Sequence, residues 1–135
     1  MIEGSCLCGA IRYFSMAEAR PVIACHCRTC RKASGNFVTT TAVPRDRLTI
    51  EGEPRWWQSS DAARRGFCPT CGTPLFWDGP GTHLSIHAGA LDTLPADLRL
   101  AGHIYCAEKG SYYEIEGDLP QAPGADPNLT TMVTP

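Results

Sequence analysis

The sequence predicts a single, mostly β domain with little helix, and three observations support this fold class. The chain has 135 residues, which is enough for one ordinary domain but too few for two. Its 13 glycines and 11 prolines are spread along the sequence and divide it into short pieces, so long helices are not expected. Many of these pieces alternate apolar and polar residues or are rich in β-branched residues, which is typical of strands in antiparallel sheets.

The expected elements follow from these pieces in chain order. Strands are predicted at 10–14, 21–24, 36–43, 48–50, 55–59 and 82–88. One helical turn fits 29–33 and ends at Gly35, because glycine readily adopts the left-handed conformation that closes a helix. Residues 51–54 fit a turn between two strands. Residues 1–124 are expected to form the domain, and 125–135 an irregular C-terminal tail packed on its surface.

Composition and charge exclude several classes of protein. With 43% hydrophobic and 19% charged residues, the chain can bury a core and is not a disordered protein. Its formal net charge of −2 gives no reason to expect binding to nucleic acid or to a membrane surface. No apolar run approaches the length of a membrane span, and the first residues lack the pattern of a signal peptide. We therefore expect a cytoplasmic protein, either a monomer or a homodimer.

Eight cysteines are the most informative feature of the composition. In a reducing cytoplasm they remain thiols, which favours metal binding or thiol chemistry over disulfides. They occur in three groups, and Cys106 stands alone. The groups are Cys6-Leu7-Cys8, Cys25-His26-Cys27-Arg28-Thr29-Cys30 and Cys68-Pro69-Thr70-Cys71. Such close spacing suits metal ligation, because two sulfurs on one tight turn can converge on a tetrahedral ion.

The first and last groups predict a structural zinc site. Pro69 fixes the backbone at the start of its turn and Gly72 permits a positive φ just after it, so backbone N–H groups can point at the sulfurs. Each pair supplies two ligands, and a closed structural site needs four. We therefore assign one zinc site to Cys6, Cys8, Cys68 and Cys71. The competing interpretation, a thioredoxin-like redox pair, expects a βαβ context that this sequence does not offer.

The middle group has three thiols, on Cys25, Cys27 and Cys30, with no fourth cysteine beside them. Three protein ligands and an open position are typical of a reactive zinc centre, which could take water, a substrate thiolate or a carbonyl oxygen. A closed second site, completed by His26, Cys106 or another histidine, fits the spacing equally well. Flanking cations would lower the pKa values of the thiols and could bind an anionic substrate. These cations are Arg28, Arg31 and Lys32.

Other candidate residues carry weaker signals. Each histidine could complete a zinc site or act as a base, but each is more often an ordinary surface or core residue. The histidines are His26, His83, His87 and His103. The ring of His26 is expected to point away from a metal bound by its neighbours. Cys106 is expected as a small core residue, and Asp92 as a turn cap rather than a substrate contact.

The cysteine motifs resemble those of the glutathione-dependent formaldehyde-activating enzyme family, which also contains centromere protein V. Residues 4–13, GSCLCGAIRY, are similar to the family's opening motif. Residues 25–35, CHCRTCRKASG, and 67–75, FCPTCGTPL, look like its central and third motifs. Weaker similarities are GALD at 89–92, HI at 103–104 followed by Lys109, and DLPQ at 118–121. The similarity extends from Gly4 to about Gly124, nearly the whole chain.

This resemblance implies a β-tent fold of small antiparallel sheets held by zinc, with two ions per chain. It implies a structural ion on the four cysteines assigned above and a second ion on Cys25, Cys27 and Cys30, whose occupancy the sequence leaves open. The implied activity is that of a carbon–sulfur lyase, which makes or breaks S-(hydroxymethyl)glutathione. One departure from the family pattern is Tyr112, which stands where the family often has tryptophan.

Three hypotheses about function follow. The first is a zinc-dependent carbon–sulfur lyase acting on adducts of a small thiol, such as glutathione, with formaldehyde or another aldehyde. Its catalytic residues would be Cys25, Cys27 and Cys30, and its substrate-binding residues Arg28, Arg31 and Lys32. The second is a non-catalytic zinc-binding module that binds a protein partner, which two closed metal sites would favour. The third is thiol redox chemistry of the middle cysteines in metal-free protein.

Overall fold

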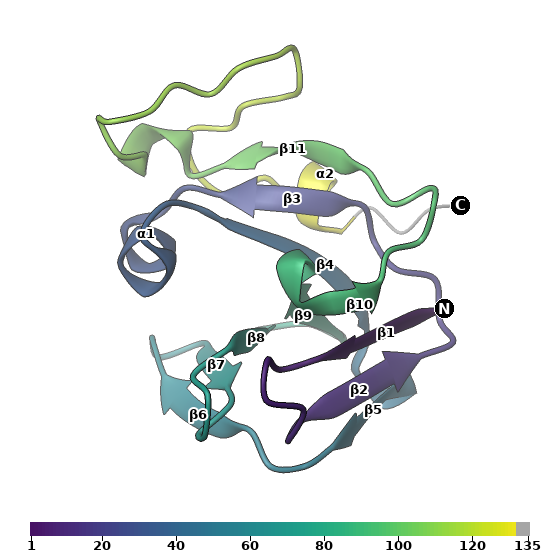
Figure 1. Ribbon diagram of the computed structural model, residues 1–135. Coiled ribbons are helices and arrows are strands. Elements are labelled where there is room, and N and C mark those ends of the chain that lie inside the picture. Colours follow the sequence, from purple (N-terminus) through teal and green to yellow (C-terminus); the bar gives the residue numbers. More distant parts are fainter. Residues whose placement is uncertain (132–135) are drawn as a thin grey trace.

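The chain forms two β-sheets with very little helix (Figure 1). The computed structural model describes residues 1–131. The small sheet has four strands in the order β10-β1-β2-β5, and the large sheet has seven in the order β11-β3-β4-β9-β8-β7-β6. The prediction of a mostly β domain with little helix is confirmed. Neighbouring strands are antiparallel apart from β3 and β11, which run parallel because a long connection brings β11 back beside β3.

The elements are short throughout. The strands are β1 (Ile2–Ser5), β2 (Arg12–Ser15), β3 (Val22–Cys25), β4 (Val38–Pro44), β5 (Leu48–Glu51), β6 (Arg55–Gln58), β7 (Arg64–Phe67), β8 (Pro74–Asp78), β9 (His83–His87), β10 (Leu91–Thr93) and β11 (Leu100–Ile104). The α-helices are α1 (Arg28–Ser34) and α2 (Pro127–Thr130), and the 3₁₀ turns are η1 (Arg45–Arg47), η2 (Ala88–Ala90) and η3 (Cys106–Glu108).

Every predicted strand is present, with ends that agree within two residues, and the predicted helical turn is α1. This helix ends at Gly35, which adopts the left-handed conformation with φ 88°. The turn at 51–54 does not form a hairpin between two paired strands. The strand before it, β5, lies beside β2 in the small sheet, whereas the strand after it, β6, is the edge of the large sheet. The chain therefore crosses from one sheet to the other at this turn.

The main core contains side chains from both sheets. Ile2 and Tyr13 come from the small sheet, whereas Phe76 and Ile86 come from the large sheet, and all four are at most 2% exposed. The rings of Tyr13 and Phe76 meet edge to face with centroids 5.1 Å apart. Cys6 and Cys68 belong to the same buried cluster, so two candidate metal ligands are built into the core.

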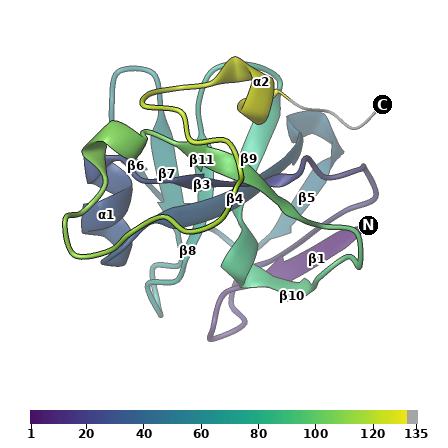
Figure 2. The ribbon, with the colours of Figure 1, turned by 90° about the horizontal axis from the view of Figure 1, so that it is seen from above.

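A smaller core lies under the C-terminal segment. It contains Ile23 of β3, Ile104 of β11 and Leu129 of α2. In Figure 2 the C-terminal segment lies over β11, and backbone hydrogen bonds join His103 to Pro120 and to Ala122. The stretch 125–135, expected as an irregular tail, thus includes a short helix with a buried leucine, and its residues 132–135 lie outside the described residues.

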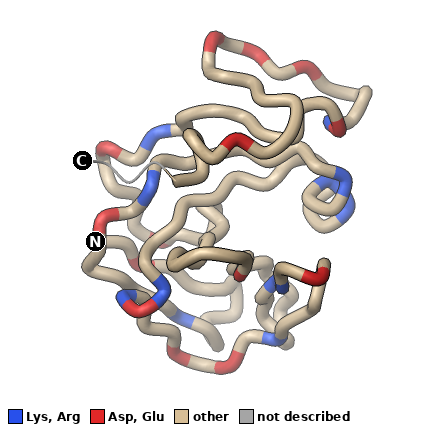
Figure 3. The backbone as a smooth tube through the Cα atoms, turned by 180° about the vertical axis from the view of Figure 1, so that it is seen from behind, with Lys and Arg blue, Asp and Glu red and all other residues tan. Residues whose placement is uncertain are grey.

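Charged residues are unevenly distributed along the backbone (Figure 3). Helix α1 carries Arg28, Arg31 and Lys32 and has no acidic residue in its first turn. The loop after η3 carries Glu114, Glu116 and Asp118, and it lies above α1 in Figure 1. None of the described helices is long and apolar enough to cross a membrane.

Candidate metal centres

Four of the eight cysteines gather in one cluster at the end of the small sheet. The Sγ atoms of Cys6, Cys8, Cys68 and Cys71 all lie within 4.8 Å of one another. Cys6 and Cys8 are 3.6 Å apart, and Cys8 and Cys68 are 3.7 Å apart. A tetrahedral zinc ion with Zn–S bonds of about 2.3 Å would place its sulfurs about 3.8 Å apart. The cluster therefore has the number, kind and spacing of ligands that a structural zinc ion requires.

Local turns hold these four sulfurs and stabilise their charge. Backbone N–H groups donate to two of them: Ile11 to Cys6 at 3.3 Å, and Thr70 to Cys68 at 3.4 Å. Gly72 has φ 77°, the positive value that its place after the second ligand predicts. Hydrogen bonds from Thr73 lower the pKa of Cys71 to about 5. Hydrogen bonds thus favour the thiolate form, which binds metal, at Cys6 and Cys71, whereas the neighbouring thiols raise the pKa of Cys8.

The other cluster comprises the three middle cysteines, Cys25, Cys27 and Cys30, whose sulfurs also lie within 4.8 Å of one another. Cys25 ends β3, Cys27 is the N-cap of α1, and Cys30 lies in the first turn of that helix. The Cys27 sulfur accepts a hydrogen bond from the Cys30 backbone at 3.4 Å. Neighbouring thiols of Cys25 and Cys30 lower the pKa of Cys27, and the same coupling raises the pKa of Cys25. This cluster could hold a metal ion through three thiolates.

The cation that contacts the three-cysteine cluster is Arg65, which the sequence analysis did not single out. Its Nη2 atom donates to the Cys30 sulfur at 3.5 Å from β7, a strand 35 residues further along the chain. No local sequence signal points to this contact, because it depends on how β7 packs against α1. The predicted cations are on α1, where Arg28 and Lys32 are exposed and Arg31 is half-buried.

His26 is buried in a polar network beside the cluster. One ring nitrogen lies 2.6 Å from the Tyr113 hydroxyl, and the other lies 2.9 Å from Nδ1 of His103. Burial, together with the charge of Lys109, lowers the pKa of His26. Both ring nitrogens are therefore engaged away from the cysteine sulfurs. Cys106 is half-buried in η3 and belongs to neither cysteine cluster among residues 1–131.

A small cavity lies beside Arg65, the residue that contacts the three-cysteine cluster. Its volume is about 170 Å³, and it lies between α1 and the strands β6, β7 and β8. Its lining residues are Ala33, Trp57, Arg65, Gly66, Phe67, Gly72, Pro74, Phe76 and His87. Burial and the charge of Arg65 lower the pKa of His87 to about 4, so this histidine is neutral at pH 7. The cavity thus has aromatic walls with one cation and one neutral imidazole.

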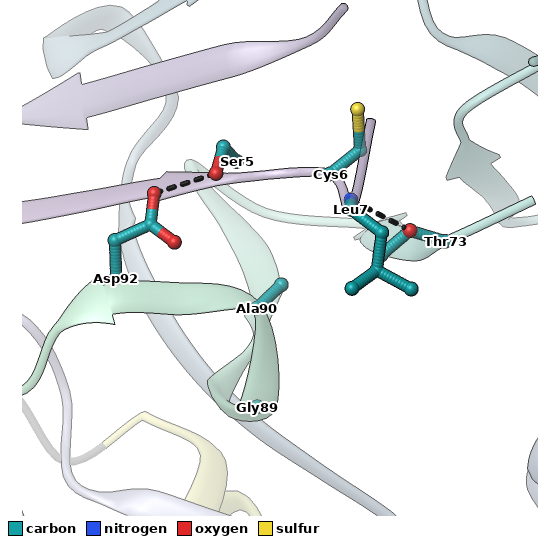
Figure 4. Close-up of a pocket in the computed structure, with 7 residues that line it drawn as sticks. All are labelled: Ser5, Cys6, Leu7, Thr73, Gly89, Ala90 and Asp92. Carbon is teal, nitrogen blue, oxygen red and sulfur yellow. Dashed lines mark hydrogen bonds between the residues drawn. The ribbon is translucent and has the colours of Figure 1, made fainter. Parts of the chain in front are cut away.

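A separate hollow of about 220 Å³ lies beside the four-cysteine cluster (Figure 4). Asp92 lines it and accepts a hydrogen bond of 2.6 Å from the Ser5 hydroxyl, while the Leu7 backbone donates to Thr73. In Figure 4 the Cys6 sulfur points away from Asp92 and Ala90, and this sulfur belongs to the four-cysteine cluster. Asp92 therefore ties β10 to β1 across the small sheet, and the turn-capping role expected for it is wrong, because η2 has no side-chain cap.

Comparison with known proteins identifies the family. A sequence model described as glutathione-dependent formaldehyde-activating enzyme matches residues 1–108. The chain belongs to this family. All three cysteine motifs fall within the matched residues, so the resemblance noted in the sequence is confirmed.

This family member is also similar to one curated protein and to one solved structure. A protein of Schizosaccharomyces pombe named as an uncharacterized lyase is 34% identical over 76 residues, which are 56% of this chain and 56% of the relative. The chain thus matches about half the length of this curated relative. A crystal structure of a Rhodobacter sphaeroides protein covers 76% of this chain and 99% of its own, with a TM-score of 0.57 and 23% identity. This second likeness shows that the two proteins share a fold.

Proposed function

We propose that this protein is a zinc-dependent carbon–sulfur lyase acting on adducts of a small thiol with an aldehyde, of the S-(hydroxymethyl)glutathione kind. The observation that carries the proposal is the unequal size of the two clusters, four sulfurs in one and three in the other. Family membership and a relative named as a lyase support it. In this proposal the protein takes a small thiol and an aldehyde as substrates and contains two zinc ions.

The four-cysteine cluster would hold the structural ion. Cys6 and Cys68 are 3% and 0% exposed, so the ion would be bound at the edge of the main core. It would join the end of β1 to the end of β7, which are about sixty residues apart in the sequence. Structural zinc contributes roughly 10–16 kcal/mol of apparent binding energy in small peptides, so it can decide whether a small domain folds.

The three-cysteine cluster would hold the second ion and leave one position for a substrate. When bound there, zinc supplies a Lewis acid that favours the thiolate form of a thiol substrate. Cys25, Cys27 and Cys30 would bind this divalent ion with one net negative charge, which the guanidinium of Arg65 offsets. The cations on α1 would attract the carboxylates of a substrate such as glutathione. These are Arg28, Arg31 and Lys32.

The reaction itself needs no oxidant or reductant. In the synthetic direction, the substrate thiolate adds to the carbonyl carbon of the aldehyde, and the carbonyl π electrons move to oxygen, which takes a proton from water. In the lyase direction, the hydroxyl releases that proton, the carbonyl re-forms, and the electron pair of the carbon–sulfur bond returns to sulfur. The protein's contribution is to hold both reactants in one orientation, which replaces a bimolecular encounter.

The proposal is tested by following exchange between glutathione, formaldehyde and their adduct by NMR with zinc-loaded protein. Cys27→Ala is expected to lower the zinc content from two ions to one and to abolish the accelerated exchange. Cys106→Ala is the matched control, because Cys106 is half-buried and belongs to neither cluster. Equal exchange rates for the wild type and Cys27→Ala would contradict the proposal. Absence of acceleration in the zinc-loaded wild type with any thiol and aldehyde would favour a non-catalytic zinc-binding module.

A further inference from the structure

The cavity between α1 and β6–β8 shares Arg65 with the three-cysteine cluster but is not used by the chemistry described above. Arg65 belongs to both, because it lines the cavity and donates to the Cys30 sulfur at 3.5 Å. Ala33 lines the cavity from α1, three residues after Cys30 and on the same face of the helix. A group held in the cavity would therefore lie next to a substrate bound at the cluster.

Strand pairing explains why Arg65 faces the cavity while its neighbour does not. Arg65 pairs with Trp57 across β6 and β7, and both line the cavity. Because side chains alternate along a strand, Arg64 faces the opposite side, where it stacks on Trp56 at 4.0 Å and binds Asp78 at 2.9 Å. Arg64 thus has a carboxylate partner in the protein.

Arg65 retains hydrogen-bonding capacity for a ligand. A guanidinium has five N–H donors, and the described residues satisfy one of them through the Cys30 sulfur. The Nε atom of Arg65 is buried and has no hydrogen-bond partner among residues 1–131. The Nη hydrogens that the described residues leave free are the donors that a ligand carboxylate could accept from in charge-assisted hydrogen bonds.

The other cavity walls limit what can bind beside Arg65. Trp57, Phe67 and Pro74 supply apolar surface, and His87 is neutral at pH 7, so Arg65 contributes the single charge of the lining. The volume of about 170 Å³ is below the 300–1,000 Å³ of pockets that take drug-sized ligands. The cavity therefore suits a short anionic group and is too small for a whole tripeptide.

We propose that this cavity is the aldehyde subsite, and that its preferred substrates are short aldehydes carrying a carboxylate that Arg65 binds. The inference rests on the proposed function and adds the class of aldehyde to it. The bond changes are those given above, and the carboxylate takes no part in them. Arg65 holds the carboxylate equally before and during the reaction, so its contribution appears in KM rather than in kcat.

The kinetic test compares two aldehydes of equal carbon number, glyoxylate and acetaldehyde, each with 2-mercaptoethanol and with 3-mercaptopropionate, using zinc-loaded protein. We expect a lower KM for glyoxylate than for acetaldehyde with either thiol. Arg65→Gln is expected to raise the KM for glyoxylate about 10- to 100-fold more than it raises the KM for acetaldehyde, which is the loss of a charge-assisted hydrogen bond to the carboxylate. Arg65→Lys, which keeps the charge, is expected to show a smaller increase. Arg64→Gln is the matched control on the same strand.

Three kinetic results would overturn the inference. Equal slowing of both aldehydes by Arg65→Gln would assign Arg65 to the cysteine cluster alone. If the KM depends on whether the thiol carries a carboxylate and not on whether the aldehyde carries one, the thiol rather than the aldehyde binds in the cavity. Equal KM values for the two aldehydes in the wild type would show that the cavity does not select anions.

A binding measurement decides the inference even if no aldehyde reacts, which by itself would contradict the proposed function. Glycolate and ethylene glycol, two unreactive molecules that differ in one carboxylate, are titrated into zinc-loaded, ¹⁵N-labelled protein. The Nε–H signal of Arg65, assigned by its loss in Arg65→Gln, is expected to shift saturably with glycolate and not with ethylene glycol. If Arg65→Gln does not fold, Arg65→Lys serves for the assignment. No shift with glycolate, or equal shifts with both molecules, would contradict the inference.

Discussion

His87 lies at the end of β9 in the cavity beside α1, and its burial makes the stability of the protein depend on pH. Burial and the nearby charge of Arg65 lower the pKa of His87 from 6.5 to about 4. Between these two values the unfolded chain binds a proton at His87 while the folded chain does not. Acidification through this range therefore favours the unfolded state, and the stability contribution of His87 is complete above pH 6.5.

The size of the effect follows from the two pKa values. Linkage gives a loss of about 2 kcal/mol in the free energy of unfolding at pH 5 and about 3 kcal/mol at pH 4, relative to pH 7. His26 and His103 are also buried with lowered pKa values, so they add to the acid sensitivity of the wild type. The contribution of His87 must therefore be measured as the difference between the wild type and His87→Gln, a variant that cannot titrate.

Urea unfolding of zinc-loaded protein at a series of pH values measures this difference. The curve of His87→Gln against pH is expected to fall less steeply than that of the wild type between pH 6.5 and 4. His83→Gln, at the other end of the same strand, controls for loss of a histidine from β9. Parallel curves for the wild type and His87→Gln would show that His87 is not held neutral by burial, and the reasoning would be refuted.

Three further predictions concern the stability of the fold. Cys6→Ser is expected to lower the zinc content by one ion per chain and to lower the melting temperature, whereas Cys106→Ser is expected to change neither. Elemental analysis measures the zinc content and calorimetry the melting temperature. An unchanged zinc content in Cys6→Ser would contradict this prediction. Gly66→Ala is expected to cost about 1–3 kcal/mol in urea unfolding, because the new Cβ would lie 2.8 Å from the Trp56 ring; a loss below about 0.5 kcal/mol would show that Trp56 moves aside freely. Leu129→Ala is expected to cost about 2–5 kcal/mol in the same assay, since Leu129 is 5% exposed in the smaller core; a neutral result would mean that α2 is not part of the cooperative domain.

Elements with a clear pattern of residue types within their own few residues could be predicted from the sequence. The strand at 36–43 is rich in β-branched residues, and helix α1 has a glycine at its end. Both elements could therefore be predicted without knowing which distant residues they contact. Strands β7 and β8 were not predicted, because RRGF reads as a polar segment and β8 follows directly on a cysteine turn. Strand β10 has only three residues and owes its strand conformation to pairing with β1.

The candidate metal ligands could be predicted because metal chemistry constrains residue type and spacing within a few residues. Two cysteines on one turn must converge, and the structure places the pairs from β1 and β7 within 4.8 Å of each other. The surroundings of the three-cysteine cluster could not be predicted in the same way. Arg65 contacts Cys30 only because β7 packs near α1, and the charge of Arg28 and Lys32 beside the cysteines in sequence gave no indication of this.

The amino-acid sequence by itself determined the mostly β character of the domain, its family, and which cysteines lie close together, because these depend on short-range spacing and composition. Tertiary structure alone decided that β3 and β11 run parallel, that the chain crosses between sheets at 51–54, and that a small cavity shares one arginine with the three-cysteine cluster. The physical reason is that side chains from separate strands meet only after the sheets have packed. The sequence therefore contains no periodic pattern from which these contacts could be predicted.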